Sequence, residues 1–144
     1  MVLVVVVAAS LASNRNAPAT SKGIEVDSTP VTSDGLKLTG LSAVTPDGTH
    51  AVGDTVTVSY SLTNVSQQDI ELEDTFVGAR NPANQHKDAE DDNEQTVLAP
   101  GESVNARGRV FLDSEGTWTM WPCYTLASGD LCPDKWQAFS LLAE

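Results

Sequence analysis

Residues 116–124 read Gly-Thr-Trp-Thr-Met-Trp-Pro-Cys-Tyr, and the chain's only other cysteine, Cys132, follows Cys123 after eight intervening residues. Trp, Thr and Tyr favour β-strands, and their alternation here is typical of a strand in an antiparallel sheet. Two cysteines that face each other on neighbouring antiparallel strands have Cβ atoms at about the separation that a disulfide needs. We therefore predict a disulfide between Cys123 and Cys132 near the end of a β-sandwich. Two reduced cysteines buried as small hydrophobes are the alternative.

The N-terminal part of the chain indicates export. Residues 2–12 are apolar apart from one serine, which is about the length of a signal-peptide core and too short to cross a bilayer as a helix. We predict that residues 1–13 are a signal peptide or the remnant of a membrane anchor, that residues 14–33 are a flexible linker, and that residues 34–144 form one domain. The protein is then secreted or tethered at the cell surface, with membrane contact only through its N-terminal segment.

The charge of the chain disfavours two classes of partner. The formal net charge is −12, with 20 acidic residues against eight Lys and Arg, and the pI is near 4.3. Binding to nucleic acid or to anionic lipid depends on clusters of basic residues, and this sequence has none. An acidic surface keeps an exported protein in solution, and a salt-rich habitat or cation binding are the alternative reasons for it.

Alternation with a period of two recurs between turn signals, as expected of an all-β domain. It is cleanest in residues 55–64, where Val56, Val58, Tyr60 and Leu62 share one face and Thr and Ser occupy the other. The pattern predicts an antiparallel sandwich with a polar surface loop over residues 79–94. About seven strands are expected, near residues 36–45, 55–64, 70–77, 96–98, 104–112, 117–126 and 135–142.

Three stretches also carry a resemblance to a known family. Residues 52–64 read VGDTVTVSYSLTN, residues 98–103 read LAPGES, and residues 116–118 read GTW. They resemble the Ig-like accessory domains of bacterial surface proteins, including the cell-adhesion-related type, in which an alternating valine strand ending in Asn precedes an L-x-PGE turn and a late Gly-Thr-Trp strand. The resemblance implies an Ig-like sandwich of about seven strands. The acidic segment and the cysteine pair depart from the commonest form of this pattern.

The two cysteines also set an expected register for the last hairpin. If Cys123 faces Cys132, then Thr119 opposes Trp136, and Trp121 becomes a diagonal neighbour of Trp136 on the face of the disulfide. We predict that these two tryptophans form a partly exposed platform for a sugar ring or a partner loop. The alternatives are that a loop or the linker covers them, or that another register places them in the core. The opposite face is more apolar and is the predicted core: Trp118, Met120, Phe139 and Leu141.

The acidic segment offers better candidate metal ligands than the two cysteines and two histidines, which lack the close spacing of a zinc site. Its carboxylates could supply hard oxygen ligands to calcium, although the segment has no Gly and no EF-hand spacing. A solvated run of charge is the alternative, and we expect no other cofactor. The candidate ligands are Asp88, Glu90, Asp91, Asp92 and Glu94.

Catalysis is not expected. His50 and His86 are the only imidazoles, and they fall in a predicted turn and in the predicted polar loop. Asn64-Val65-Ser66 matches a glycosylation sequon, while the alternative is that Asn64 ends its strand and starts a turn. The sequence therefore predicts a non-catalytic extracellular interaction or accessory module with a protein or polysaccharide partner outside the cell. A carbohydrate-binding module and a small secreted hydrolase are the alternatives.

Overall fold

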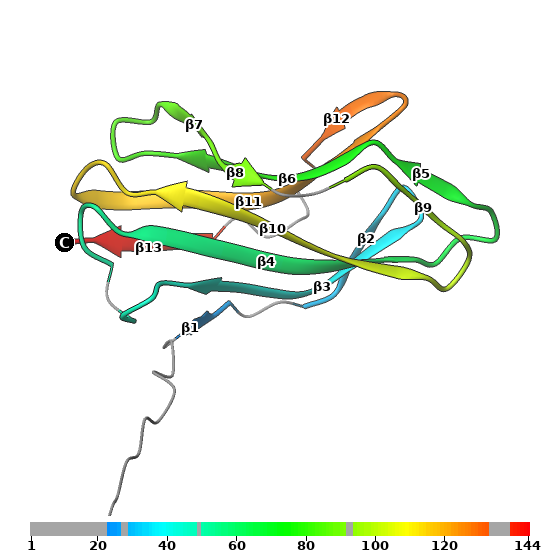
Figure 1. The fold of residues 1–144 in the computed structure, drawn as a ribbon, viewed down its shortest axis with the longest axis horizontal. Helices are drawn as coiled ribbons and strands as arrows, with labels where there is room; N and C mark the ends of the chain where they lie inside the picture. Colours follow the sequence, from blue (N-terminus) through cyan, green and yellow to red (C-terminus); the bar gives the residue numbers. More distant parts are fainter. Residues whose placement is uncertain (1–22, 27–28, 49, 92–93, 133–138) are drawn as a thin grey trace, which may run out of the picture.

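The computed structural model describes residues 23–26, 29–48, 50–91, 94–132 and 139–144. Its elements are all β-strands, and they form two main antiparallel sheets and a small third one. Figure 1 shows the long strands of both main sheets running roughly along the long axis of the domain. Within the described part of the chain, no helix is long and apolar enough to span a membrane.

The larger sheet is built around β4 (Thr55–Asn64), which pairs on one edge with β3 (Leu36–Val44) and on the other with β10 (Ser103–Phe111). Short strands complete its edges. β1 (Gly23–Glu25) and β2 (Val31–Ser33) pair with β3, and β8 (Glu90–Asp91) pairs with β10.

The smaller sheet is built around β11 (Gly116–Leu126). Its partner on one edge is β6 (Asp74–Arg80), which in turn pairs with β7 (His86–Asp88). β12 (Gly129–Leu131) and β13 (Phe139–Ala143) also pair with β11. A separate pair is formed by β5 (Ile70–Leu72) and β9 (Thr96–Leu98).

The core lies between the two main sheets, and it is the core that the alternation predicts. Val56, Val58, Tyr60 and Leu62 of β4 are buried, whereas the Thr and Ser residues between them are only partly covered. On β11, Trp118, Met120 and Tyr124 are fully buried, and Leu141 of β13 is buried with them. The side chain of Phe139 lies outside what the structure describes.

The antiparallel all-β class is confirmed, but the strands are shorter and more numerous than the seven predicted. The predicted strand 70–77 is interrupted at Glu73, because β5 pairs with β9 whereas β6 pairs with β11. The amide of Glu73 donates to the carbonyl oxygen of Thr125 at 2.9 Å, at the point where the chain changes partner.

The predicted polar loop 79–94 contains two short strands, β7 and β8. They lie on the edges of different sheets, and only residue Ala89 separates them. Polar residues are compatible with an edge strand, because one side of such a strand faces solvent. A polar composition alone therefore did not distinguish this edge from a loop.

The sheet also extends into the segment predicted as a linker. β2 and β3 form a hairpin in which Ser33 pairs with Leu36, and the two residues between them, Asp34 and Gly35, have φ values of 51° and 77°. Positive φ at both positions is the geometry that Asp-Gly favours in a two-residue hairpin turn. The Asp-Gly dipeptide was thus a hairpin signal at the predicted domain boundary.

The L-x-PGE turn closes against the end of β4. Gly101 has a φ of 86°, as the third position of a type II turn requires, and its amide donates to the carbonyl oxygen of Asn64 at 2.8 Å. The buried Asn64 side chain donates through Nδ2 to the carbonyl oxygens of Gln68 and Leu98 at 2.7 and 2.8 Å, and its Oδ1 accepts from the amide of Ser66. Both hydrogens of Nδ2 are used, so the sequon functions here as a strand end and turn.

Candidate functional site around Trp121

A disulfide joins Cys123, in β11, to Cys132, which follows β12, with a Cα–Cα distance of 4.4 Å. In the hairpin that it closes, Tyr124 pairs with Leu131 and Leu126 with Gly129. This is the register that directly opposed cysteines predict. Cys123 is fully buried and lies two residues from Trp121. The disulfide therefore links β11 covalently to the end of β12 next to Trp121.

The register does not continue past the disulfide, and this part of the prediction is wrong. Thr119 pairs with Ser140 of β13 instead of with Trp136, a displacement of four residues. The intervening sequence begins with Pro133, which has no amide hydrogen for a ladder bond and therefore disfavours an uninterrupted strand. Trp136 lies outside the described residues, so its place in a two-tryptophan platform stays a prediction.

Trp121 itself lies on the outer face of the smaller sheet and is half-buried. Its register partner on β6 is Gly78. A Cβ added to Gly78 would stand 2.3 Å from Nε1 and 2.8 Å from Cζ2 of Trp121, far inside van der Waals contact. The indole therefore lies across the backbone of β6, over a position where only glycine leaves room for it.

Polar side chains of β7 border the ring on the far side of Gly78. Asp88 pairs with Gly78, and His86 pairs with Arg80, so that both β7 residues share the face of Trp121. The centroid of the His86 ring is 6.4 Å from that of Trp121, at an interplanar angle of 50°. His86 Nε2 lies 3.2 Å from Asp88 Oδ1, and both side chains are exposed. The half-buried indole thus has an imidazole beside it, and that imidazole has a carboxylate beside it on the same face of the sheet.

The hairpin that presents these groups is held by its own turn. The amide of Gln85 donates to Oδ1 of the buried Asn81 at 2.8 Å, and Nδ2 of Asn81 donates back to Oε1 of Gln85 at 2.9 Å. Arg80 donates through Nη1 to the carbonyl oxygen of Asn84 at 3.0 Å. These contacts fix β7 against β6, and with it the position of His86.

The strand that carries Trp121 is also hydrogen-bonded to the larger sheet at two points, a feature that the sequence did not indicate. The Tyr60 hydroxyl is 2.7 Å from the carbonyl oxygen of Cys123, and the Tyr124 hydroxyl donates to the Asp34 carboxylate. Burial raises the pKa of Tyr60 and, together with the bond to Asp34, that of Tyr124. The same hydrogen bond lowers the pKa of Asp34 below its ordinary value of 3.8.

Two of the candidate calcium ligands, Asp88 and Asp91, line the same hollow, although they come from strands of different sheets. Asp88 pairs with His86 on the smaller sheet, whereas Glu90 and Asp91 occupy consecutive positions of β8 on the larger one. Asp92 lies outside the described part of the chain, and Glu94 is exposed. No group of three or more His, Cys, Asp or Glu side chains in the described residues is placed to hold a metal ion.

The two histidines lie in different hollows. His86 lines one of about 260 Å³ with Phe76 and several aspartates, and His50 lines another of about 380 Å³ with Leu142 and Glu144. Nδ1 of His50 is buried without a hydrogen-bond partner among the described groups. The hollow of His86 also includes Thr125, whose hydroxyl donates to Oδ1 of Asp130 at 2.8 Å, and the described lining of the hollow of His50 contains no serine, threonine or cysteine.

No family model matches this chain, and no curated protein matches it at a significant level. The crystal structure of a protein from Bordetella pertussis described as ApaA is similar, with a TM-score of 0.54 and 14% identity over 75% of this chain and 93% of that one. A FixG-related protein from Vibrio parahaemolyticus has a TM-score of 0.47 and 15% identity, over 78% of this chain and 99% of that one. The yjhA protein from Bacillus subtilis has a TM-score of 0.47 and 9% identity, over 81% and 96%. At these identities the likeness to the first structure concerns the fold alone.

Proposed function

We propose that this chain is a non-catalytic interaction or accessory module that acts outside the cell, either secreted or tethered at the cell surface. The observation that carries the proposal is the half-buried Trp121 ring, which lies over Gly78 and beside His86, with Asp88 next to the imidazole. The disulfide and the apolar N-terminal run support an oxidising location. The Ig-like family assignment belongs to the same proposal.

Rigidity is what makes Trp121 suited to contact a partner. Ordering a flexible side chain on binding costs roughly 0.5–1.5 kcal/mol, and a ring that is already packed on its own sheet avoids much of that loss. Trp121 is packed over Gly78 and sits two residues from a disulfide-linked cysteine. The ring is therefore a preorganised surface of the kind that interfaces enrich.

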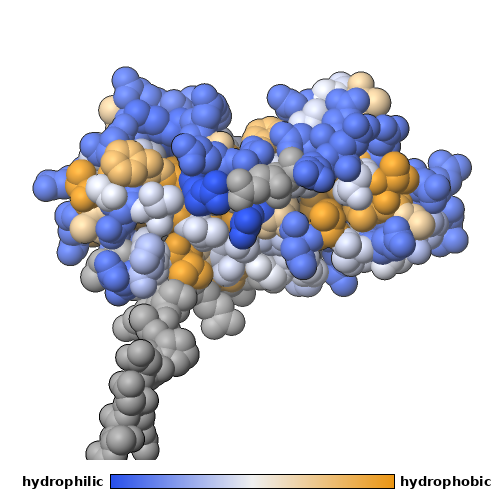
Figure 2. Space-filling model, in the orientation of Figure 1, coloured by the Kyte–Doolittle hydropathy of each residue, from blue (hydrophilic) through white to orange (hydrophobic). Residues whose placement is uncertain are grey.

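The surface of the domain otherwise favours polar contacts. The large hydrophobic side chains that are exposed among the described residues belong to separate strands and turns: Val52, Val65, Val97, Phe111 and Leu142. On the face shown in Figure 2, hydrophobic residues form separate patches among hydrophilic ones. A partner that combines a small apolar face with many hydrogen-bonding groups fits such a surface best.

Of the two kinds of partner, this geometry favours a polysaccharide. The second candidate function is therefore a carbohydrate-binding module. The C–H face of a sugar ring stacks on a flat aromatic ring, while its hydroxyls need donors and acceptors at the edge. Trp121 offers the ring, and His86 and Asp88 offer both kinds of polar group.

We propose no catalytic role for the described residues. Among the described contacts, His86 Nε2 lies 3.2 Å from Oδ1 of Asp88, and the imidazole lies beside the indole of Trp121. A hydrolytic site would need a nucleophile within hydrogen-bond reach of the base, and these contacts supply none.

The proposal is tested by binding of the labelled domain to intact cells that produce it and to cellohexaose, chitohexaose and soluble peptidoglycan fragments. Trp121→Ala should lower binding strongly. Phe111→Ala is the matched control, because it removes an exposed aromatic ring from β10 of the larger sheet. Equal binding by the two variants would reject the Trp121 surface. Binding to cells but to none of the saccharides would favour a protein partner.

A further inference from the structure

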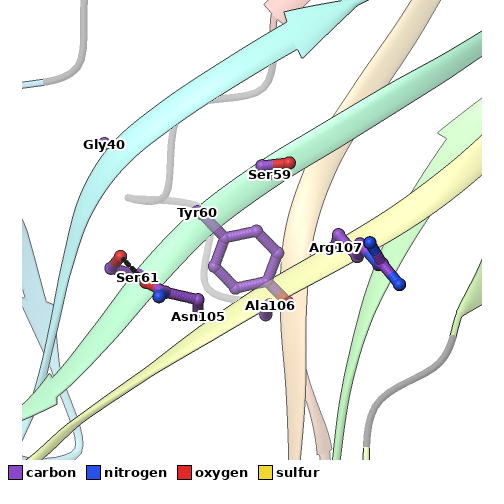
Figure 3. Close-up of a pocket in the computed structure, with 7 residues that line it drawn as sticks. All are labelled: Gly40, Ser59, Tyr60, Ser61, Asn105, Ala106 and Arg107. Atoms are coloured by element: carbon purple, nitrogen blue, oxygen red, sulfur yellow. Dashed lines mark hydrogen bonds between the residues drawn. The ribbon is translucent and has the colours of Figure 1, made fainter.

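A hollow of about 530 Å³ lies on the outer face of the larger sheet, on the side of the sandwich opposite Trp121. This volume falls within the range of small-ligand sites. It crosses three adjacent strands, β3, β4 and β10, and Figure 3 shows its lining. The lining residues are Gly40, Ser59, Tyr60, Ser61, Asn105, Ala106 and Arg107.

The hollow coincides with a β-bulge in β3. The register between β3 and β4 shifts between Thr39 and Ser42, and Gly40 has a φ of 65° at that point. No heavy atom lies within 4 Å of the position that a Cβ of Gly40 would occupy, so this part of the surface is open. Bulges commonly re-aim a strand next to a binding site, and this one leaves the centre of the sheet uncovered.

The side chains around the hollow are hydrogen-bonding groups with a fixed arrangement. Ser61 Oγ donates to Oδ1 of Asn105 at 2.6 Å, which leaves Nδ2 of Asn105 as a donor at the rim. Ser59 adds a hydroxyl group, and Arg107, two residues further along β10, adds a guanidinium with five N–H donors, enough for more than one partner. Figure 3 shows Ser61 and Asn105 together at one side of the hollow and Arg107 at the other.

The charge of this face differs from that of the whole chain. Of the five Lys and Arg residues in the described part of the chain, three belong to the outer face of this sheet: Lys37, Arg107 and Arg109. Glu90, the register partner of Arg109, shares this face at its edge. None of the described residues that line the hollow is acidic. In a chain with a formal charge of −12, this is a local site for an anionic group.

The position of the hollow also limits the kind of ligand. β4 is paired along both edges, with β3 and with β10, so its main-chain groups are already used in the sheet. A peptide could not add here as an extra strand, and recognition must go through side chains. Hydroxyl and amide side chains suit the hydroxyls of a sugar, and the guanidinium suits a planar carboxylate.

We infer that this hollow binds a sugar unit that carries a carboxylate, a uronic acid within a polysaccharide. Arg107 binds the carboxylate, and Ser59 and Asn105 bind ring hydroxyls. This site goes beyond the proposed Trp121 surface and does not depend on it, because the two lie on opposite sheets.

The test is a titration of the ¹⁵N-labelled full chain with trigalacturonate at about 150 mM salt, an ionic strength that screens long-range attraction beyond about 8 Å. Amide signals near Ser59, Ser61 and Asn105 should shift on binding. Arg107→Gln should weaken binding by about tenfold or more, as expected for the loss of a hydrogen bond between charged groups. Arg109→Gln is the matched control, since it removes the same charge from the same face without lining the hollow.

The methyl-esterified trimer, which lacks the carboxylate, should bind the wild-type chain as weakly as trigalacturonate binds Arg107→Gln. The ester comparison keeps the test decisive if that variant does not fold. Equal weakening by the two arginine variants, equal affinity for acid and ester, or no binding at millimolar concentration would overturn the inference. Shifts confined to Trp121 and His86 would also reject this site, while supporting the sugar form of the proposed function.

Discussion

The hydroxyl oxygen of Tyr60 lies 2.7 Å from the carbonyl oxygen of Cys123, so a side chain of the larger sheet is hydrogen-bonded to the central strand of the smaller one. The same hydroxyl is 2.9 Å from the carbonyl oxygen of Phe76, the register partner of Cys123. Tyr60 is 2% exposed, so these contacts are made out of water. One phenol therefore fixes the spacing of the two sheets beneath the disulfide.

Tyr60→Phe should destabilise the domain by about 1–3 kcal/mol, the usual effect of leaving a buried polar group without its partner. The ring remains and the core stays filled, so the loss reports the hydroxyl. Urea denaturation with comparable m-values measures it. Tyr124→Phe is the matched control and should lose less, because its acceptor, Asp34, is an exposed carboxylate that water can solvate. An equal loss of stability in both variants would show that the buried hydrogen bond of Tyr60 stabilises the domain no more than the exposed one of Tyr124.

Stability should also fall at alkaline pH, because the pKa values of Tyr60 and Tyr124 are both raised in the folded domain, and the hydroxyl of Tyr60 is the more deeply buried of the two. Burial raises its pKa above the ordinary value of 10.0, so below pH 10 the phenol is neutral in both the folded and the unfolded state. Above pH 10 the unfolded chain loses the proton and the folded chain keeps it. The free energy of unfolding then decreases by about 1.4 kcal/mol per pH unit for this group.

Urea titrations between pH 9 and pH 11.5 test this dependence. Tyr60→Phe lacks the group, so its stability should decline less steeply over the same range. Lysine titration and the Lys87–Asp113 ion pair contribute equally to both proteins and cancel in the difference. Parallel curves for the two proteins would contradict the assignment to Tyr60.

The two tryptophans of β11 should respond differently to truncation. Trp118 is fully buried and its Nε1 donates to the carbonyl oxygen of Ser114 at 3.0 Å, whereas Trp121 is half-buried on the outer face. Trp118→Ala should cost roughly 3–5 kcal/mol and Trp121→Ala appreciably less. Urea denaturation of both single variants decides the order. If Trp121→Ala is as damaging as Trp118→Ala, Trp121 is a core residue and the proposed binding surface loses its basis.

Local patterns predicted a large part of this fold. Alternation gave the buried face of β4, and the spacing of the two cysteines gave the pairing of β11 with β12. Both depend on neighbours along a strand or across one short hairpin, where geometry follows from sequence. The Asp34-Gly35 hairpin was also readable from its dipeptide and was overlooked.

The features of the fold and of the site that were not predicted depend on contacts between segments that are distant in the sequence. Extending the cysteine register to Trp136 assumed one continuous strand. In the structure, Thr119 pairs with Ser140 of β13, four residues beyond the partner that this register predicts. The bond from Tyr60 to Cys123 joins residues 63 positions apart and exists only once two sheets are stacked. For Trp121, the alternation gave the correct face, but its packing over Gly78 required the register of β6, which no local signal supplies.

Gly78 provides the sharpest test of how Trp121 lies. Gly78→Ala should destabilise the domain, because the new Cβ would stand 2.3 Å from Nε1 of Trp121 and push the ring off the sheet. In the Trp121→Ala background the obstacle is gone, and the same change should be neutral or stabilising by about 0.4–1 kcal/mol, since alanine restricts the unfolded chain. The four proteins form a double-mutant cycle measured by urea denaturation. An effect of Gly78→Ala that is the same in both backgrounds would mean that the indole does not lie over Gly78, and the preorganised ring on which the proposed function rests would then be lost.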